Sequence, residues 1–152
     1  LRECSSIKKC VLHVIGDWKK KESFIQDVLN IGINVVDHKD LTNQNQIQEV
    51  LDECNYGLNI INYDGINSEA LDYMCGQIPI INSVQGDLKQ YCELWDIGKN
   101  IDIHNYKSVA KTICEENKSI QLKRRGNVHN LYNTYFTVEK FFETLDKSGG
   151  SL

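Results

Sequence analysis

The sequence has no long hydrophobic run and no strong excess of charge of either sign. None of its apolar stretches approaches the ~18 residues that a membrane-spanning helix needs. The formal net charge is -4, whereas a general nucleic-acid-binding protein normally presents a basic face, so nucleic acid is not an expected partner. The first residues also lack a basic segment followed by an apolar one. We therefore predict no signal peptide and a cytoplasmic protein.

The six cysteines form no C-x-x-C pair. Cys54, Cys75, Cys92 and Cys114 fall within predicted helices, where cysteine commonly acts as a small buried hydrophobic residue. A disulfide framework is typical of short secreted chains, and this chain is long enough for a core of its own, so we expect reduced thiols. No histidine stands at metal-ligand spacing from a cysteine, so no metal site is predicted.

Several catalytic motifs are also absent. The sequence has no G-x-G-x-x-G loop, no P-loop, no G-x-S-x-G elbow and no H-E-x-x-H. We therefore assign no catalytic residue within this chain. His13 is interpreted as an ordinary strand or core residue. The basic run Lys123-Arg124-Arg125 is interpreted as the solvated face of a helix.

What the sequence does contain is a regular alternation of short apolar runs and helical patterns. The apolar runs predict strands at residues 10–15, 33–36, 58–61, 79–81 and 100–103. Helices are predicted between them, one capped by Thr42, another at Ser68–Cys75, and a third opened by Gly86 and ended by Gly98. This alternation is typical of right-handed βαβ units. We predict one α/β domain over residues 1–152, with a Rossmann-like open parallel sheet of about five to six strands and helices on both faces.

The most informative segment, residues 64–83, links the third predicted strand to the fourth. Gly65 permits a close approach of the backbone, and the amides of Ile66, Asn67 and Ser68 lead into the predicted helix. A helix N-terminus offers free N–H groups and a positive dipole end, which suit a phosphate group. Glu69, in the first turn, could accept hydrogen bonds from sugar hydroxyls. The segment therefore predicts a nucleotide site, with ordinary helix capping by Asn67 or Ser68 as the alternative.

Two other loops are candidates for the same site. In open parallel sheets, ligands bind beyond the carboxyl ends of the strands. Gly16 follows the first predicted strand, and His38 ends the second. Asp64 follows the third predicted strand, next to the glycine turn. We expect these three residues to contribute to nucleotide binding as well.

Residues 58–103 resemble the nucleotide-binding half of GT-B glycosyltransferases of the group 1, or family 4-like, type. The stretches that carry the resemblance are S-E-A-L-D-Y-M from Ser68, G-Q-I-P-I-I-N from Gly76, the pair Gly86-Asp87, and I-G-K-N from Ile97. More loosely, the stretch L-H-V-I-G-D from Leu12 is similar to the opening strand of that half. The resemblance implies that the chain is the C-terminal, donor-binding domain of such an enzyme.

In this family the donor ribose is held by the second glutamate of an E-x7-E pattern, and Glu69 matches that position. The resemblance also implies that the diphosphate lies against the backbone of Gly65, Ile66 and Asn67, and that the base stacks near His38. Ile61 stands eight residues before Glu69, so the first glutamate is missing from its usual place. A loop one residue shorter would move that position to Asn62 or Asp64.

The resemblance implies an enzyme, as the full-length parent, that transfers a sugar from a nucleotide-diphosphate sugar to a glycan or lipid-linked acceptor in surface polysaccharide synthesis, without a cofactor. Its N-terminal, acceptor-binding domain would be missing from this chain, which begins with Leu1 rather than methionine. The isolated domain is then expected to be inactive. Residues 119–145, helical and aromatic in pattern, are expected to pack partly within the core and partly against the missing half or in a dimer. Association with a membrane surface is expected of the full-length enzyme alone.

Two alternatives stay open. One is a fragment of a nucleotide-sugar epimerase, which shares the fold. The other is a non-catalytic Rossmann-like signalling or interaction module. A signalling receiver needs clustered acidic residues after its first strand, and Asp17 has no acidic neighbour there, although Asp64 lies near the place of a phosphoacceptor.

Overall fold

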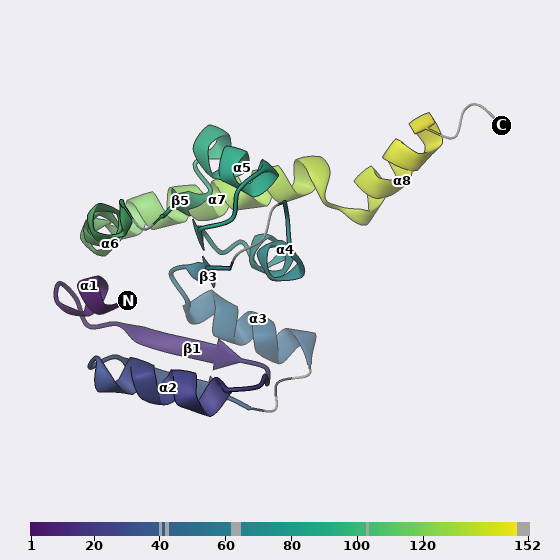
Figure 1. Cartoon of the computed structure of the whole chain (residues 1–152). Helices are drawn as coiled ribbons and strands as arrows, with labels where there is room; N and C mark the ends of the chain where they lie inside the picture. The colour runs from purple at the N-terminus through teal and green to yellow at the C-terminus, as the bar shows by residue number, and fades with distance from the viewer. Residues whose placement is uncertain (40, 42, 62–64, 103, 149–152) are drawn as a thin grey trace. The chain divides into compact units, whose positions relative to one another are not determined.

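The computed structural model describes residues 1–39, 41, 43–61, 65–102 and 104–148 (Figure 1). Helices and short parallel strands alternate, which confirms the α/β class. The chain divides into two compact units. Unit 1 comprises Leu1–Asn55 and Ile101–Asn117, and unit 2 comprises Tyr56–Asn100 and Lys118–Leu152. The expectation of a single domain stays a prediction.

Unit 1 is built on two parallel strands, β1 and β2. Its elements are α1 (Arg2–Ser5), β1 (Val11–Ile15), α2 (Lys21–Asn30), β2 (Asn34–His38), α3 (Gln44–Glu53) and α6 (Tyr106–Glu115). The strands pair with Ile15 opposite His38. Helix α2 packs against β2, and Val14, Val28 and Ile33 are buried. Leu51 of α3 and Ala110 of α6 are the other buried apolar residues among those described in this unit.

Unit 2 contains a three-stranded parallel sheet in the order β3-β4-β5. Its elements are β3 (Gly57–Asn59), α4 (Ser68–Cys75), β4 (Ile80–Asn82), α5 (Asp87–Trp95), β5 (Gly98–Asn100), α7 (Lys118–Tyr135) and α8 (Val138–Ser148). The long helix α7 packs against α4 and α5. The fully buried side chains of Met74, Ile80, Leu88 and Leu131 join these helices to the sheet in one core.

The prediction of one open sheet of five to six strands is wrong. Among the described residues, five strands form two separate parallel sheets, one of two strands and one of three. The apolar runs located the strands to within a few residues. A run of apolar residues indicates that a strand forms, but it does not identify the neighbour to which that strand hydrogen-bonds.

Several predicted boundaries also need correction. Helix α5 ends at Trp95, followed by Asp96 in the left-handed conformation, so Gly98 does not end this helix but begins β5. A Cβ atom at Gly98 would lie 1.8 Å from the carbonyl oxygen of Ile80, so the close approach of β4 is what requires glycine here. The N-cap of α3 is Asn43, whose side chain accepts a hydrogen bond from the Asn45 amide. Thr42, the predicted cap, lies outside the described residues.

The C-terminal part of the chain forms two helices, α7 and α8, separated by Phe136 and Thr137. Tyr132 and Phe136 pack on the core of unit 2, which confirms the predicted core packing for these two side chains. Cys75, Cys92 and Cys114 lie within helices as predicted, but the prediction is wrong for the place of Cys54 and the burial of Cys75. Cys92 is buried in α5, whereas Cys75 is exposed and Cys54 follows α3 as its C-cap.

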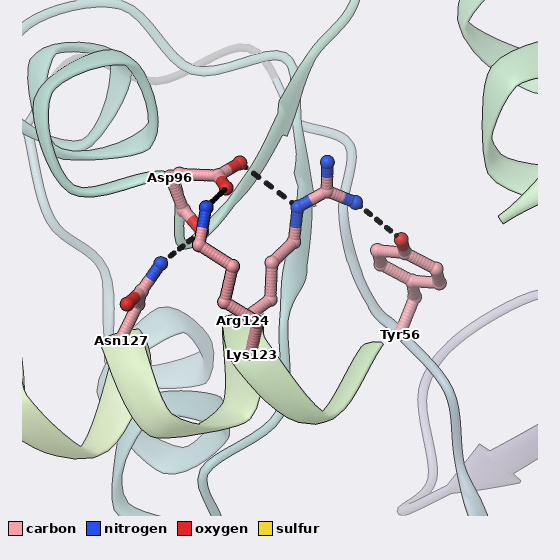
Figure 2. A network of polar contacts seen from close by, with 5 residues as sticks. All are labelled: Tyr56, Asp96, Lys123, Arg124 and Asn127. Carbon is pink, nitrogen blue, oxygen red and sulfur yellow. Dashed lines mark hydrogen bonds and ion pairs between the residues drawn. The ribbon is translucent and has the colours of Figure 1, made fainter. Parts of the chain in front are cut away.

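The basic run in α7 is solvated only in part: Lys123 is exposed and Arg125 half-buried, whereas Arg124 is buried. Arg124 is only 4% exposed. Figure 2 shows its guanidinium group between Asp96, at 3.0 Å from Nε to Oδ1, and the hydroxyl of Tyr56, at 2.7 Å from Nη1. Burial acts to raise the pKa of Asp96, but the hydrogen bond and charge of Arg124, with those of Lys123, hold it below its ordinary value. Arg124 thus ties α7 to the end of α5 and to the residue before β3.

Within the described ranges, no helix has both the length and the apolar character that crossing a membrane requires.

Candidate functional site

The candidate site lies at the carboxyl edge of the β3-β4-β5 sheet in unit 2. The loop after β3 leads through Gly65 into α4, and the loop after β4 leads through Gly86 into α5. The strands are parallel, so both loops and both helix N-termini lie at the same edge of the sheet. This is the edge at which open parallel sheets bind ligands.

The two glycine turns are in direct backbone contact. The amide of Gly65 donates a hydrogen bond to the carbonyl oxygen of Gln85, at 3.2 Å. Both glycines have positive φ angles, 103° at Gly65 and 79° at Gly86. A Cβ atom on Gly86 would lie 3.2 Å from the nitrogen of Gly65. The two loops can therefore approach this closely because Gly86 lacks a side chain.

Ile66 and Asn67 connect this turn to α4. Ile66 packs against the core of the unit and so anchors the loop. Asn67 occupies the N-cap position, but its side chain makes no capping hydrogen bond. Instead its Nδ2 donates to the carboxylate of Glu69, at 2.6 Å. Side-chain capping by Asn67, the simpler interpretation of this segment, is therefore not what the side chain does.

Glu69 is an exposed residue in the first turn of α4. Its own backbone amide and the side chain of Asn67 lower the pKa of its carboxyl group, the hydroxyl of Ser68 does so further, and slight burial opposes them. The Ser68 hydroxyl donates to Oε2 at 3.2 Å. Glu69 therefore carries a negative charge at neutral pH and can accept hydrogen bonds from hydroxyl groups of a ligand.

A row of asparagine side chains lies behind this edge. Asn59, Asn82 and Asn100 are the last residues of β3, β4 and β5, and they stand opposite one another in the sheet register. Asn59 donates to Asn82 at 3.3 Å, and Asn82 donates to Asn100 at 2.9 Å. Asn67 in turn donates to Asn59 at 2.9 Å. A continuous chain of amides thus reaches from β5 to the residue that contacts Glu69.

Unit 1 presents a second polar cluster at the carboxyl edge of its own sheet. Gly16 turns the chain after β1 with a φ of 87°. Lys21, only 6% exposed, donates to the carbonyl oxygen of Gly16 and forms an ion pair with Asp37. His38 Nε2 lies 3.1 Å from Nδ1 of His13. One imidazole donates and the other accepts, so His13 is the hydrogen-bond partner of the predicted ligand residue.

The structure brings together five of the eight predicted site residues: Gly65, Ile66, Asn67, Ser68 and Glu69 are contiguous at one edge of unit 2. Gly16 and His38 belong to unit 1, where they lie at the carboxyl ends of β1 and β2. Asp64 lies outside the described residues, as does Asn62. Ile61, at the place of the missing first glutamate, is 44% exposed.

Sequence reasoning missed the asparagine row and the buried Lys21. A signal for the row is present, since each of the three short strands ends in asparagine. It becomes informative only once the register is known, because pairing decides whether three such residues are neighbours. Lys21 gave no signal, since it is the last of three consecutive lysines and its burial depends on Asp37 of the neighbouring strand.

In the described part of the chain, no three histidine, cysteine, aspartate or glutamate side chains are grouped so that they could hold a metal ion. No protein-family model, characterised protein or solved structure matches this chain. What the site can do chemically follows from its own groups. An ionised carboxylate can accept hydrogen bonds from a diol. The glycine turn and the helix N-terminus beside it can face a phosphate group.

Proposed function

We propose that unit 2 carries the donor-nucleotide site of a glycosyltransferase of the GT-B type. The observation that carries this proposal is the setting of Glu69. Its carboxylate is held ionised by Asn67 and Ser68, at the start of a helix, next to two glycine turns in backbone contact. The resemblance of residues 58–103 to the donor-binding half of these enzymes supports the same assignment.

Each group has a distinct role in this proposal. Glu69 accepts hydrogen bonds from the two ribose hydroxyls of the donor. The backbone from Gly65 to Ser68 faces the diphosphate, where amide dipoles and the positive end of α4 favour negative charge. Stabilisation of a departing nucleoside diphosphate by such groups is a general means of accelerating glycosyl transfer. The binding site for the sugar acceptor and the remaining catalytic groups would lie in a domain outside this chain.

Titration calorimetry of the chain with UDP, GDP and ADP tests the proposal. At least one of them should bind, and Glu69→Gln should weaken that binding about tenfold, the value of one hydrogen bond to a charged group. The same substitution should leave the affinity for inorganic pyrophosphate unchanged, because pyrophosphate has no ribose.

Glu139→Gln is the matched control. Glu139 also lies in the first turn of a helix, α8, and its pKa is likewise lowered by its own backbone amide and by a neighbouring hydroxyl, that of Thr137. This control should not change nucleotide affinity. Equal affinities of wild type and Glu69→Gln for the nucleotide that binds would refute the assignment of Glu69.

A further inference from the structure

Four asparagine side chains in unit 2 are linked head to tail. Starting from β5, Asn100 accepts a hydrogen bond from Asn82, Asn82 accepts one from Asn59, and Asn59 accepts one from Asn67. Every amide NH₂ group in this asparagine row points the same way along the chain of bonds. Asn67 uses its NH₂ group a second time, as the donor to Oε2 of Glu69 at 2.6 Å.

The row is locked at its buried members. Asn82 is fully buried, and both ends of its amide are also bonded to the backbone of Val84: the Val84 amide donates to Oδ1 at 3.0 Å, and Nδ2 donates to the Val84 carbonyl at 2.8 Å. Asn100 is held by the carbonyl oxygen of Lys89 at 3.0 Å and by Glu93 at 3.3 Å. No amide in the row can rotate by half a turn without facing its neighbours with the wrong group, donor to donor or acceptor to acceptor.

The locked orientation of Asn59 has a consequence for Asn67. Asn59 is 1% exposed, and because its NH₂ group is committed to Asn82, its oxygen must face Asn67. Asn67 can therefore satisfy Asn59 only by presenting its own NH₂ group, and that same group reaches Glu69.

We propose that the asparagine row is a positioning device for Glu69, with Asn67 as the contacting residue and Asn59 acting through it. The inference rests on the proposed function, because it is Glu69 that would hold the donor ribose. The row keeps the carboxylate charged and turned into one orientation before the ligand arrives. A preorganised acceptor loses less conformational freedom on binding than a mobile one.

The competing explanation is that the row only fixes the register of β3, β4 and β5. Both explanations predict that Asn59→Ala lowers the melting temperature, because Asn82 loses a buried partner. They differ at Glu69, which Asn59 does not contact. The pKa of the Glu69 carboxyl group, followed by NMR of its side-chain carbon, therefore distinguishes them.

The test measures this pKa in the wild type, Asn67→Ala, Asn59→Ala and Asn127→Ala. Asn127, a half-buried asparagine of the same unit that donates to the Asp96 carbonyl oxygen, lies outside the row and is the control. The pKa of Glu69 should rise towards the ordinary value of 4.5 in Asn67→Ala and, by a smaller step, in Asn59→Ala. It should not move in Asn127→Ala.

Nucleotide affinity supplies the second readout. Asn67→Ala should weaken nucleoside diphosphate binding about five- to tenfold, and this loss should disappear when Glu69→Gln is already present, because the row acts through Glu69. An unchanged Glu69 pKa in Asn59→Ala, together with a lowered melting temperature, would show that the row is structural and overturn the proposal. If Asn59→Ala does not fold, Asn59→Ser, which is too short to reach Asn67, takes its place under the same criterion.

The two readouts separate this inference from the proposed function. If the wild type binds no nucleoside diphosphate but Asn59→Ala raises the pKa of Glu69, the positioning device stands and the glycosyltransferase assignment fails. If a nucleoside diphosphate binds and Glu69→Gln weakens that binding, but Asn59→Ala leaves the pKa of Glu69 unchanged, the proposed function stands and the positioning role of the row fails.

Discussion

At the scale of single residues, Glu69 and Gly86 shape the candidate site through opposite properties. Glu69 contributes a charge, which its neighbours Asn67 and Ser68 stabilise by hydrogen bonds. Gly86 has no side chain, so its backbone can approach that of Gly65. Glu69 thus supplies a charged acceptor, and Gly86 allows the two turns to lie in contact.

If unit 2 binds a nucleotide as proposed, the charge on Glu69 should make that binding depend on pH in a defined direction. Its pKa in the folded chain lies below the ordinary value of 4.5, so the carboxylate is ionised above that value and is lost as pH falls through the folded pKa. We expect nucleotide affinity to be constant from pH 7 to about 5 and to fall below pH 4.5. In Glu69→Gln this fall should be absent, and calorimetry across the range would show it.

Gly86→Ala should destabilise unit 2 by about 2–3 kcal/mol. The φ of 79° and ψ of -143° at Gly86 lie in a region that is essentially restricted to glycine, and the added Cβ would meet the Gly65 backbone. Gly16→Ala is the control, because its φ is also positive but nothing lies within 4 Å of the added atom. It should cost about 1–2 kcal/mol, the price of the left-handed conformation alone. Urea denaturation measures both free energies of unfolding. If Gly86→Ala and Gly16→Ala lower them equally, the contact between the two turns does not contribute to stability.

At the scale of elements, short strands and a long helix determine how unit 2 is assembled. Each strand of its sheet has three residues, too few to stabilise a sheet without support. The support comes from α7, whose Val128 and Leu131 are fully buried in the core. Arg124 on the same helix adds a polar tie to Asp96 and Tyr56 (Figure 2).

Replacing Arg124 should therefore loosen α7. Arg124→Ala removes a buried side chain together with its hydrogen bonds to Asp96 and Tyr56, so we expect a loss of about 2–3 kcal/mol in the free energy of unfolding. Lys123→Ala is the matched control, since Lys123 also pairs with Asp96 but its side chain is 70% exposed. It should cost no more than about 0.5 kcal/mol.

The effect of Arg124→Ala should also depend on pH. The folded pKa of Asp96 lies below its ordinary value of 3.8, so the ion pair stabilises the fold above that pH and is lost as pH falls through the folded value. The difference between wild type and Arg124→Ala should therefore narrow below pH 3.8 in thermal melts. A difference that stays constant down to pH 2 would show that packing, rather than charge, accounts for the loss.

At the scale of the whole molecule, the chain passes more than once between its two units. Unit 2 takes in residues 56–100 and the segment that begins at Lys118, while Ile101–Asn117 returns to unit 1. Truncations can therefore be chosen to affect unit 2 while leaving every residue of unit 1 in place. Each unit also carries its own tryptophan, Trp18 in unit 1 and Trp95 in unit 2, which provides a local optical probe.

Truncation after Thr137 should be tolerated by unit 2. It removes α8, where Val138 and Phe142 are 67% and 57% exposed, and retains Tyr135, which contacts Trp95 edge to face. Truncation after Asn117 removes α7 as well and should unfold unit 2, because Val128 and Leu131 leave the core. The emission of Trp95, followed in a Trp18→Phe background, should shift to longer wavelength only in the shorter chain. If the Trp95 emission shifts equally in both truncated chains, α8 contributes to the core of unit 2.

The local structure of this chain was largely predictable from its sequence. The apolar runs located the five strands of the described residues to within a few positions, and Ser68–Cys75 was predicted with its observed bounds, because glycines lie near both of its ends. Gly65 to Glu69 were grouped by the same signals because they are neighbours in the chain. Their part in ligand binding stays a prediction.

What only the tertiary structure decided depends on pairing between distant segments. Sequence could not show that five strands form sheets of two and three, that three strand-ending asparagines bond to one another, or that Arg124 is buried between Asp96 and Tyr56. Periodicity and capping act over a few residues, and these signals are written in the sequence itself. Strand register and the burial of a charge depend on which remote group stands opposite, and that is settled only when the chain has folded.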